Sequence, residues 1–251
     1  MSSIRRMAPL VLPATSRHTA TVIFIHGLGD TGHGWADAVE QMKRSRNRLD
    51  EVKFILPHAP TIPITMRLNQ TPQNGGFPMP GWFDIKALGY SVDSLGAKSV
   101  DEDRPGILRS QGYFHGLIQE EINAGIPSDR IILGGFSQGG AMSILSGLTA
   151  SVKLGGIVGL SSWLLLSQSF KDLVPASNIN KATPVLMGHG DMDPLVRFPL
   201  AQDSEKALKD LGYDVTMKVY RGMEHSACLE ELSEVEAFLA KQLPAKGKTE
   251  L

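Results

Sequence analysis

The segment RIILGGFSQGGAM, residues 130–142, is the most informative part of the sequence about the fold. An apolar, β-branched run leads into Gly135-x-Ser137-x-Gly139, and residues 141–145 continue with helical character. This order of strand, sharp turn and helix is typical of a nucleophile elbow, whose flanking glycines avoid a collision of side chains. We therefore predict that Ser137 is a nucleophile presented at the end of a strand. A plain glycine-rich turn is the alternative.

A serine nucleophile needs a histidine base and an acid, which follow an elbow serine in the order acid, then histidine. Residues 184–190 form an apolar run typical of a buried strand, and Asp191 and Asp193 come directly after it. We predict Asp193 as the acid. Asp191 is the rival, although a loop aspartate in that position commonly hydrogen-bonds the backbone of its own turn.

The predicted base is His225. Residues 215–220 alternate as in a half-buried strand, His225 lies in the loop that follows, and a helix is predicted over residues 229–239. The chain has seven histidines. Six of them precede the required position, lie in the N-terminal region or fall within a helix predicted over residues 106–123: His18, His26, His33, His58, His115 and His189.

An oxyanion hole is expected from two backbone N–H groups. One belongs to Gln138, the residue after the serine, at the positive end of its helix. The other comes from the loop after an early strand, here residues 26–30 after the apolar run 21–25. Glycines on either side let this backbone approach a substrate closely, which makes the Leu28 N–H the candidate.

Seven segments carry a further pattern: FIHGLGDTGHGW (24–35), LPHAP (56–60), GWFDI (81–85), GFSQGGA (135–141), SSWL (161–164), GHGDMDPLV (188–196) and MEHS (223–226). Together they resemble the acyl-protein thioesterases of the lysophospholipase and carboxylesterase family, and most closely the fungal type. The resemblance spans about residues 9–243.

This resemblance implies an α/β class fold, a single-domain α/β-hydrolase with a mostly parallel central sheet and helices on both faces. It implies hydrolysis of palmitoyl thioesters on proteins, with Ser137, Asp193 and His225 as the triad and Leu28 and Gln138 as oxyanion donors. A tryptophan of the family's acyl site corresponds to Trp163. The acyl-binding candidates on the family pattern are Leu68, Phe77, Met79, Trp82 and Trp163.

Two segments depart from the family pattern. Residues 67–77 and 89–100 are longer than expected, and the first is also more polar. Both fall where the family builds the rim and floor of its acyl channel, so they leave the acyl-chain preference open. For residues 67–77 a surface insertion without contact to the substrate is the alternative, because Asn, Gln, Pro and Gly dominate its composition.

Composition and charge bear on the number of domains and on the kinds of partner and cofactor. With 251 residues, 42% hydrophobic and 20% charged, the chain can bury a full core as one domain over residues 1–251, with its core at about 9–243. A net charge of −1 gives no electrostatic reason to bind nucleic acid, and we expect at most transient membrane contact. The pattern of His residues predicts no metal site, and no Gly-x-Gly-x-x-Gly indicates a nucleotide, so no cofactor is expected.

The single cysteine, Cys228, excludes an intramolecular disulfide and favours a reducing compartment. The first nine residues carry charges but lead into no apolar stretch of a secretory signal. We therefore expect a cytoplasmic protein, with the nucleus as a second compartment.

The predicted function is the hydrolysis of S-acyl groups, chiefly palmitoyl, on protein cysteines, so S-acylated proteins are the expected partners. A broad carboxylesterase or a lysophospholipase acting on lysophospholipids is the first alternative, because the same machinery serves oxygen esters and a fold does not fix the substrate. A non-catalytic lipid-binding protein of this fold is the second alternative, although all three triad residues are present.

Overall fold

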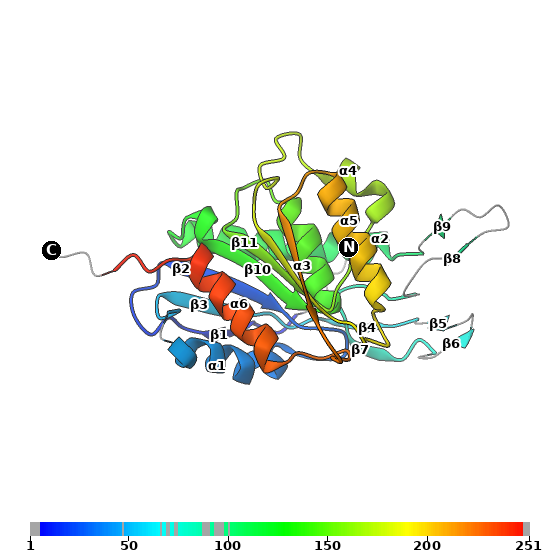
Figure 1. Cartoon of the computed structure of the whole chain (residues 1–251), viewed down its shortest axis with the longest axis horizontal. Helices are drawn as coiled ribbons and strands as arrows, with labels where there is room; N and C mark the ends of the chain where they lie inside the picture. The colour runs from blue at the N-terminus through cyan, green and yellow to red at the C-terminus, as the bar shows by residue number, and fades with distance from the viewer. Residues whose placement is uncertain are drawn as a thin grey trace.

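The centre of the molecule is a mostly parallel β-sheet (Figure 1). The computed structural model describes residues 6–46, 48–65, 67–68, 71–72, 75–86, 91–92, 98–99 and 101–247. Within these ranges seven strands pair in the order β1-β3-β2-β10-β11-β12-β13, and the edge strand β1 is antiparallel to β3. Their bounds are β1 (Leu10–Leu12), β2 (Ala20–Ile25), β3 (Val52–Leu56), β10 (Ile131–Phe136), β11 (Gly156–Leu160), β12 (Val185–Gly190) and β13 (Val215–Tyr220).

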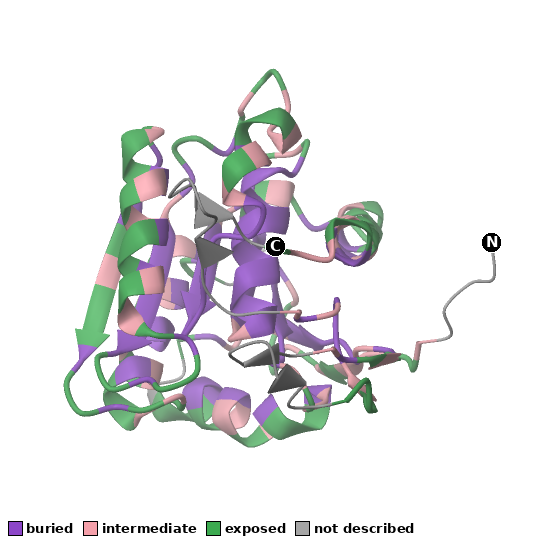
Figure 2. Ribbon diagram, turned by 90° about the vertical axis from the view of Figure 1, so that its right-hand side faces the viewer, coloured by how far each residue is buried: buried purple, intermediate pink, exposed green. Residues whose placement is uncertain are grey.

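Helices cover both faces of this sheet, as predicted, and the alternating residues of β2 show the two cores. Val22 and Phe24 pack into a cluster with α1 (Ala36–Arg46) and α6 (Leu229–Gln242). Ile23 and Ile25 point the other way, into a cluster that includes α2 (Arg104–Asn123), α3 (Gln138–Leu148), α4 (Phe170–Leu173) and α5 (Phe198–Asp210). Figure 2 shows the buried residues concentrated along the sheet and the inner sides of these helices.

The elements predicted from the sequence are present. The strands expected over 21–25, 184–190 and 215–220 correspond to β2, β12 and β13, and the helices expected over 106–123 and 229–239 correspond to α2 and α6. Short 3₁₀ turns are η1 (Gly32–Trp35), η2 (Ser128–Arg130) and η3 (Ser167–Ser169). In the described part of the chain, no helix combines the length and the hydropathy needed to cross a bilayer.

Within the described ranges, three short antiparallel pairs lie outside the main sheet. They are β4 (Thr61–Pro63) with β7 (Pro78–Pro80), β5 (Arg67–Leu68) with β6 (Thr71–Pro72), and β8 (Ser91–Val92) with β9 (Lys98–Ser99). Figure 1 shows β5/β6 and β8/β9 at its right-hand end, with β4/β7 closer to the main sheet. The pairs β5/β6 and β8/β9 belong to the two long segments, 67–77 and 89–100, whose other residues lie largely outside the described ranges. Their effect on substrate choice stays a prediction.

The turn between β10 and α3 has the geometry predicted for the elbow. Ser137 has φ 54° and ψ −122°, a backbone conformation that is rare for any residue other than glycine. A Cβ on Gly135 would lie 2.6 Å from the backbone of Gly139, and one on Gly139 would lie 2.1 Å from the Ile25 carbonyl oxygen in β2. Both positions therefore exclude a side chain, because α3 starts in direct contact with the sheet.

This contact predicts the effect of one added methyl group. The Gly139→Ala variant should lose about 3 kcal/mol of unfolding free energy, since the new Cβ meets rigid backbone rather than a flexible side chain. Urea denaturation of the purified protein measures the change. Gly116→Ala is the matched control, because Gly116 is an exposed position of α2 where a Cβ meets no atom within 4 Å. That change should instead add about 0.5–1 kcal/mol. Equal effects of the two substitutions would contradict the packing described above.

Candidate active site

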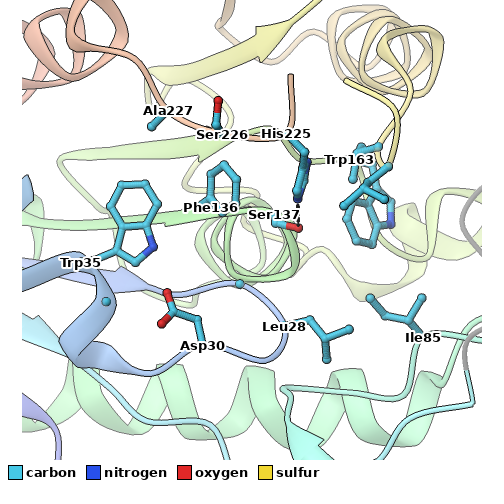
Figure 3. A pocket seen from close by; sticks show the side chains of 14 residues that line it. Leu28, Asp30, Trp35, Ile85, Phe136, Ser137, Trp163, His225, Ser226 and Ala227 are labelled. Atoms are coloured by element: carbon cyan, nitrogen blue, oxygen red, sulfur yellow. Dashed lines mark hydrogen bonds between the residues drawn. The ribbon is translucent and has the colours of Figure 1, made fainter. Parts of the chain in front are cut away.

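The parallel sheet brings the three predicted triad residues to one edge. Ser137 follows β10, Asp193 follows β12 and His225 follows β13, so all three lie at carboxyl ends of strands. The Ser137 Oγ lies 2.9 Å from the His225 Nε2, and the His225 Nδ1 lies 2.7 Å from the Asp193 Oδ2. One chain of hydrogen bonds therefore joins a hydroxyl, an imidazole and a carboxylate. Figure 3 shows Ser137 and His225 facing each other.

The Asp193 carboxylate is held in its ionised form. Its side chain is buried, which alone would raise its pKa. The hydrogen bond from His225 and those from the backbone N–H groups of Leu195 and Val196, both 2.9 Å long, outweigh burial and lower the pKa overall. The group can therefore stabilise a positive charge on the imidazole.

Asp191, the rival for the acid role, lies elsewhere. Its side chain is exposed, and its Oδ1 accepts a hydrogen bond from the Gly222 N–H at 2.6 Å. This contact ties the loop after β12 to the loop after β13, which carries His225. The structure brings Asp193 to His225 and gives Asp191 the backbone-bonding position common for loop aspartates.

The two predicted oxyanion donors lie beside the serine. A Cβ on Gly27 would lie 3.3 Å from the Ser137 Cβ, so the loop that carries Leu28 passes directly over the elbow. The N–H of Gln138 is the first of α3 and belongs to the groups that have no partner inside the helix. The buried Gln138 side chain is occupied, because it accepts from the Trp82 N–H and donates to the Phe83 carbonyl.

A pocket of about 410 Å³ opens at Ser137 and His225. In Figure 3, Leu28, Ile85 and Trp163 lie on one side of the serine, and Asp30, Trp35 and Phe136 lie on the other. The first side is apolar. The second combines two aromatic rings with a carboxylate and continues toward Ser226 and Ala227. A substrate carbonyl at Ser137 could therefore extend an apolar chain to one side and a more polar group to the other.

The five acyl-binding candidates have different locations. Trp163 lines the pocket, whereas Phe77 is 71% exposed and Met79, in β7, is not among the lining residues. The side chain of Leu68 lies outside the described part of the structure. The interpretation of Trp82 needs correction, because its ring is buried in the core and its indole N–H donates to the His26 carbonyl at 2.8 Å. It supports the loop of residues 26–30 rather than lining the pocket.

Similarity to known proteins identifies the family of this chain. A model of the family described as Phospholipase/Carboxylesterase matches residues 7–243. The chain belongs to this family. Acyl-protein thioesterase 1 of Gibberella zeae is 62% identical over 242 residues, which cover 96% of this chain and 98% of that protein. Acyl-protein thioesterase 1 of Neurospora crassa is 59% identical over 244 residues, covering 97% and 95%.

A solved structure agrees with the fold. The crystal structure of Zea mays acyl-protein thioesterase 2 superposes with a TM-score of 0.77 at 29% identity, covering 94% of this chain and 98% of that one. The α/β-hydrolase fold and the family indicated by the seven sequence segments are therefore confirmed.

In this member of the phospholipase/carboxylesterase family, several residues line the pocket that the sequence alone does not place there. Phe136 precedes the serine, and its ring packs 4.9 Å from the His225 ring and 5.4 Å from the Trp35 ring, measured between centroids. The apolar wall also includes Ile85, and Leu195 and Val196 line the pocket too. The sequence feature that indicates a place near the site is their position inside the GWFDI, GFSQGGA and GHGDMDPLV segments.

A second carboxyl group lies behind the His225 loop. Glu231, in the first turn of α6, is fully buried, and among the described residues neither of its carboxyl oxygens has a hydrogen-bond partner. Burial, with a smaller effect of the nearby Glu234, raises the pKa of Glu231 to about 8. The group is therefore protonated in the folded protein at neutral pH.

Glu231 predicts a pH dependence of stability. Its pKa is about 8 in the folded protein, against 4.5 without the fold, so the folded state binds an extra proton between these values and loses stability as pH rises through that window. Glu231→Gln removes this penalty. The variant should match the wild type near pH 5 and gain up to ~4 kcal/mol by pH 8, at about 1.4 kcal/mol per pH unit. Urea unfolding at both pH values measures the difference, and parallel pH curves for the two proteins would contradict it.

Proposed function

We propose that this protein is a serine hydrolase that cleaves S-acyl groups, chiefly palmitoyl, from protein cysteines. The observation that carries the proposal is the hydrogen-bonded chain from Ser137 through His225 to Asp193 at the mouth of a pocket with one apolar side. The names of the two fungal relatives, which match over nearly their whole length, support a thioester as the bond cleaved.

In the first step, the Ser137 Oγ attacks the thioester carbonyl carbon while the His225 Nε2 accepts the hydroxyl proton. Asp193 stabilises the imidazolium that forms. The negative charge on the carbonyl oxygen receives hydrogen bonds from the N–H groups of Leu28 and Gln138, which are fixed before the substrate arrives.

In the second step, the carbon–sulfur bond breaks and the cysteine thiolate leaves with the proton held by His225. The acyl group stays on the Ser137 oxygen as an ester. Water then attacks this ester, His225 accepts one of its protons and returns it to the serine oxygen, and the fatty acid departs. One water molecule is consumed in each cycle, and the serine is restored.

A carboxylesterase or lysophospholipase activity is the second candidate, because the family description names phospholipases and carboxylesterases together. The two are separated by comparing kcat/KM for a palmitoylated cysteine peptide with that for lysophosphatidylcholine. The proposal predicts faster turnover of the peptide, and a preference for the phospholipid would overturn it. The hydrogen-bonded Ser137 argues against a non-catalytic lipid carrier, which would leave a fluorophosphonate probe unreacted.

The proposed setting is the cytoplasm, with the nucleus as a second compartment. Cys228 is free, as a reducing compartment allows. S-acylated proteins are the proposed partners, and contact with the membrane that holds them is transient.

The assignment of the acid predicts unequal effects at two neighbouring aspartates. Asp193→Asn should lower kcat on the order of 10⁴-fold, because His225 loses the carboxylate that fixes its tautomer and stabilises its charge. Asp191→Asn, the matched control, keeps an amide oxygen that can still accept the hydrogen bond from the Gly222 N–H, so kcat should change little. Steady-state kinetics on a short-chain ester, with circular dichroism to verify folding, measure both. A larger loss in Asp191→Asn would exchange the two roles.

The pocket wall predicts a chain-length effect. Leu195→Ala removes apolar surface at a half-exposed position that lines the pocket, so it should lower kcat/KM for octanoyl and palmitoyl esters about 3–10-fold. The acetyl ester is too short to reach this wall and should change little. Val219→Ala is the control, because Val219 is similarly exposed, 48% against 52%, and does not line the pocket. Equal losses for all chain lengths would remove Leu195 from the acyl site.

A further inference from the structure

His189 lies directly beneath the loop that carries Asp193. It is the fifth residue of β12, and its ring is fully buried. Its Nε2 lies 2.7 Å from the Val196 carbonyl oxygen and 3.5 Å from the Asp193 Oδ2. Val196 in turn donates its N–H to the Asp193 Oδ1. The imidazole therefore lies against the turn of residues 193–196, near the Asp193 carboxylate and in contact with Val196, the residue whose N–H bonds that carboxylate.

The surroundings fix the protonation of this imidazole. A carbonyl oxygen can only accept, so the Nε2 that faces Val196 carries the hydrogen. Burial lowers the pKa of His189, which keeps the ring neutral and leaves its Nδ1 unprotonated. That Nδ1 has no hydrogen-bond partner among the described residues. A neutral donor beside Asp193 leaves the charge of the carboxylate available to His225.

The glycines on either side determine which way His189 points. Successive side chains of a strand alternate between faces, so residues 188 and 190 face away from His189. A Cβ on Gly188 would lie 2.4 Å from the Glu231 Oε1, and one on Gly190 would lie 2.0 Å from the Met223 carbonyl oxygen. That side of β12 is therefore in close contact with α6 and with the loop that leads to His225. Residues 188–190 of β12 are therefore packed against both the loop that carries Asp193 and the loop that leads to His225.

We infer that His189 is a positioning residue, whose Nε2–H holds the loop 193–196 so that Asp193 meets His225 in a productive geometry. The inference rests on the proposed function, because it concerns the acid of that triad. His189 itself touches neither the substrate nor the serine. Its effect passes through the orientation of Asp193, which Val196 bonds from within the same turn.

Two amide substitutions test this role with the same chemistry and different reach. In His189→Gln the amide N–H₂ occupies about the place of Nε2 and can still donate to the Val196 carbonyl. In His189→Asn the amide is one carbon shorter and cannot. We expect His189→Asn to lower kcat about 10–100-fold with KM nearly unchanged, and His189→Gln to recover most of the loss, because a shift on the order of 1 Å in a catalytic group can cost ~100-fold.

The control variant is His115→Asn. His115 is also a histidine whose Nε2 contacts a backbone carbonyl, that of Ser146 at 2.8 Å, but it lies in α2, and neither residue lines the pocket. It should retain wild-type kcat. Melting temperatures of all variants show whether each protein is folded under the assay conditions. A loss of kcat equal in His115→Asn would contradict a specific role for His189.

The decisive comparison places His189→Asn in the Asp193→Asn background. If His189 acts through Asp193, the second substitution should change the residual hydrolysis of an activated short-chain ester less than about twofold. A full 10–100-fold further loss there, or no loss in His189→Asn alone, would overturn the inference. Failure of the proposed function would show differently, because Asp193→Asn would then keep its activity by itself.

Discussion

The close approach of α3 to the sheet is the constraint on which the rest of the structure depends. Gly139 begins this helix so near to β2 that a single methyl group would overlap the Ile25 carbonyl. This approach holds Ser137 at a positive φ, with its hydroxyl away from the core and toward the strand ends. The strain is offset by the buried surface of α3, all of whose residues are buried. Ser137 is therefore held in the pocket by packed secondary structure, as its proposed role as the nucleophile requires.

Parallel pairing turns this local geometry into a complete site. Because β2, β10, β12 and β13 run in one direction, the loops after them meet at one edge and bring Leu28, Ser137, Asp193 and His225 together. Contacts between these loops keep them in register. Asp191 bonds Gly222 across the acid and base loops, Phe136 packs on the His225 ring, and Gln138 ties the elbow to residues 82 and 83. The site is thus a property of several loops rather than of one motif.

Much of the fold and of the candidate site could be predicted from the sequence. The features that could not be predicted depend on packing between segments that are distant in the sequence, or on burial. The sharp turn at Ser137, the strands that end before Asp193 and His225, and the helices α2 and α6 follow from local patterns of glycine, apolar runs and periodicity. The family pattern places Trp82 in the acyl site, but its burial depends on packing against segments distant in the sequence. Ile85 and Phe136 reach the pocket for the same reason. The buried, protonated Glu231 has no local signature, since an acidic residue in a first helical turn is ordinarily solvated.

In the proposed reaction, Ser137 carries the acyl group between the two steps. The most direct measurement is rapid acid quenching of the enzyme during turnover of a palmitoylated cysteine peptide, followed by proteolysis and mass spectrometry. We expect a palmitoyl ester on the fragment that contains Ser137, formed and lost at rates consistent with kcat. A palmitoyl group found instead on Cys228 or another side chain, or turnover at the full rate with no acylated fragment, would contradict it.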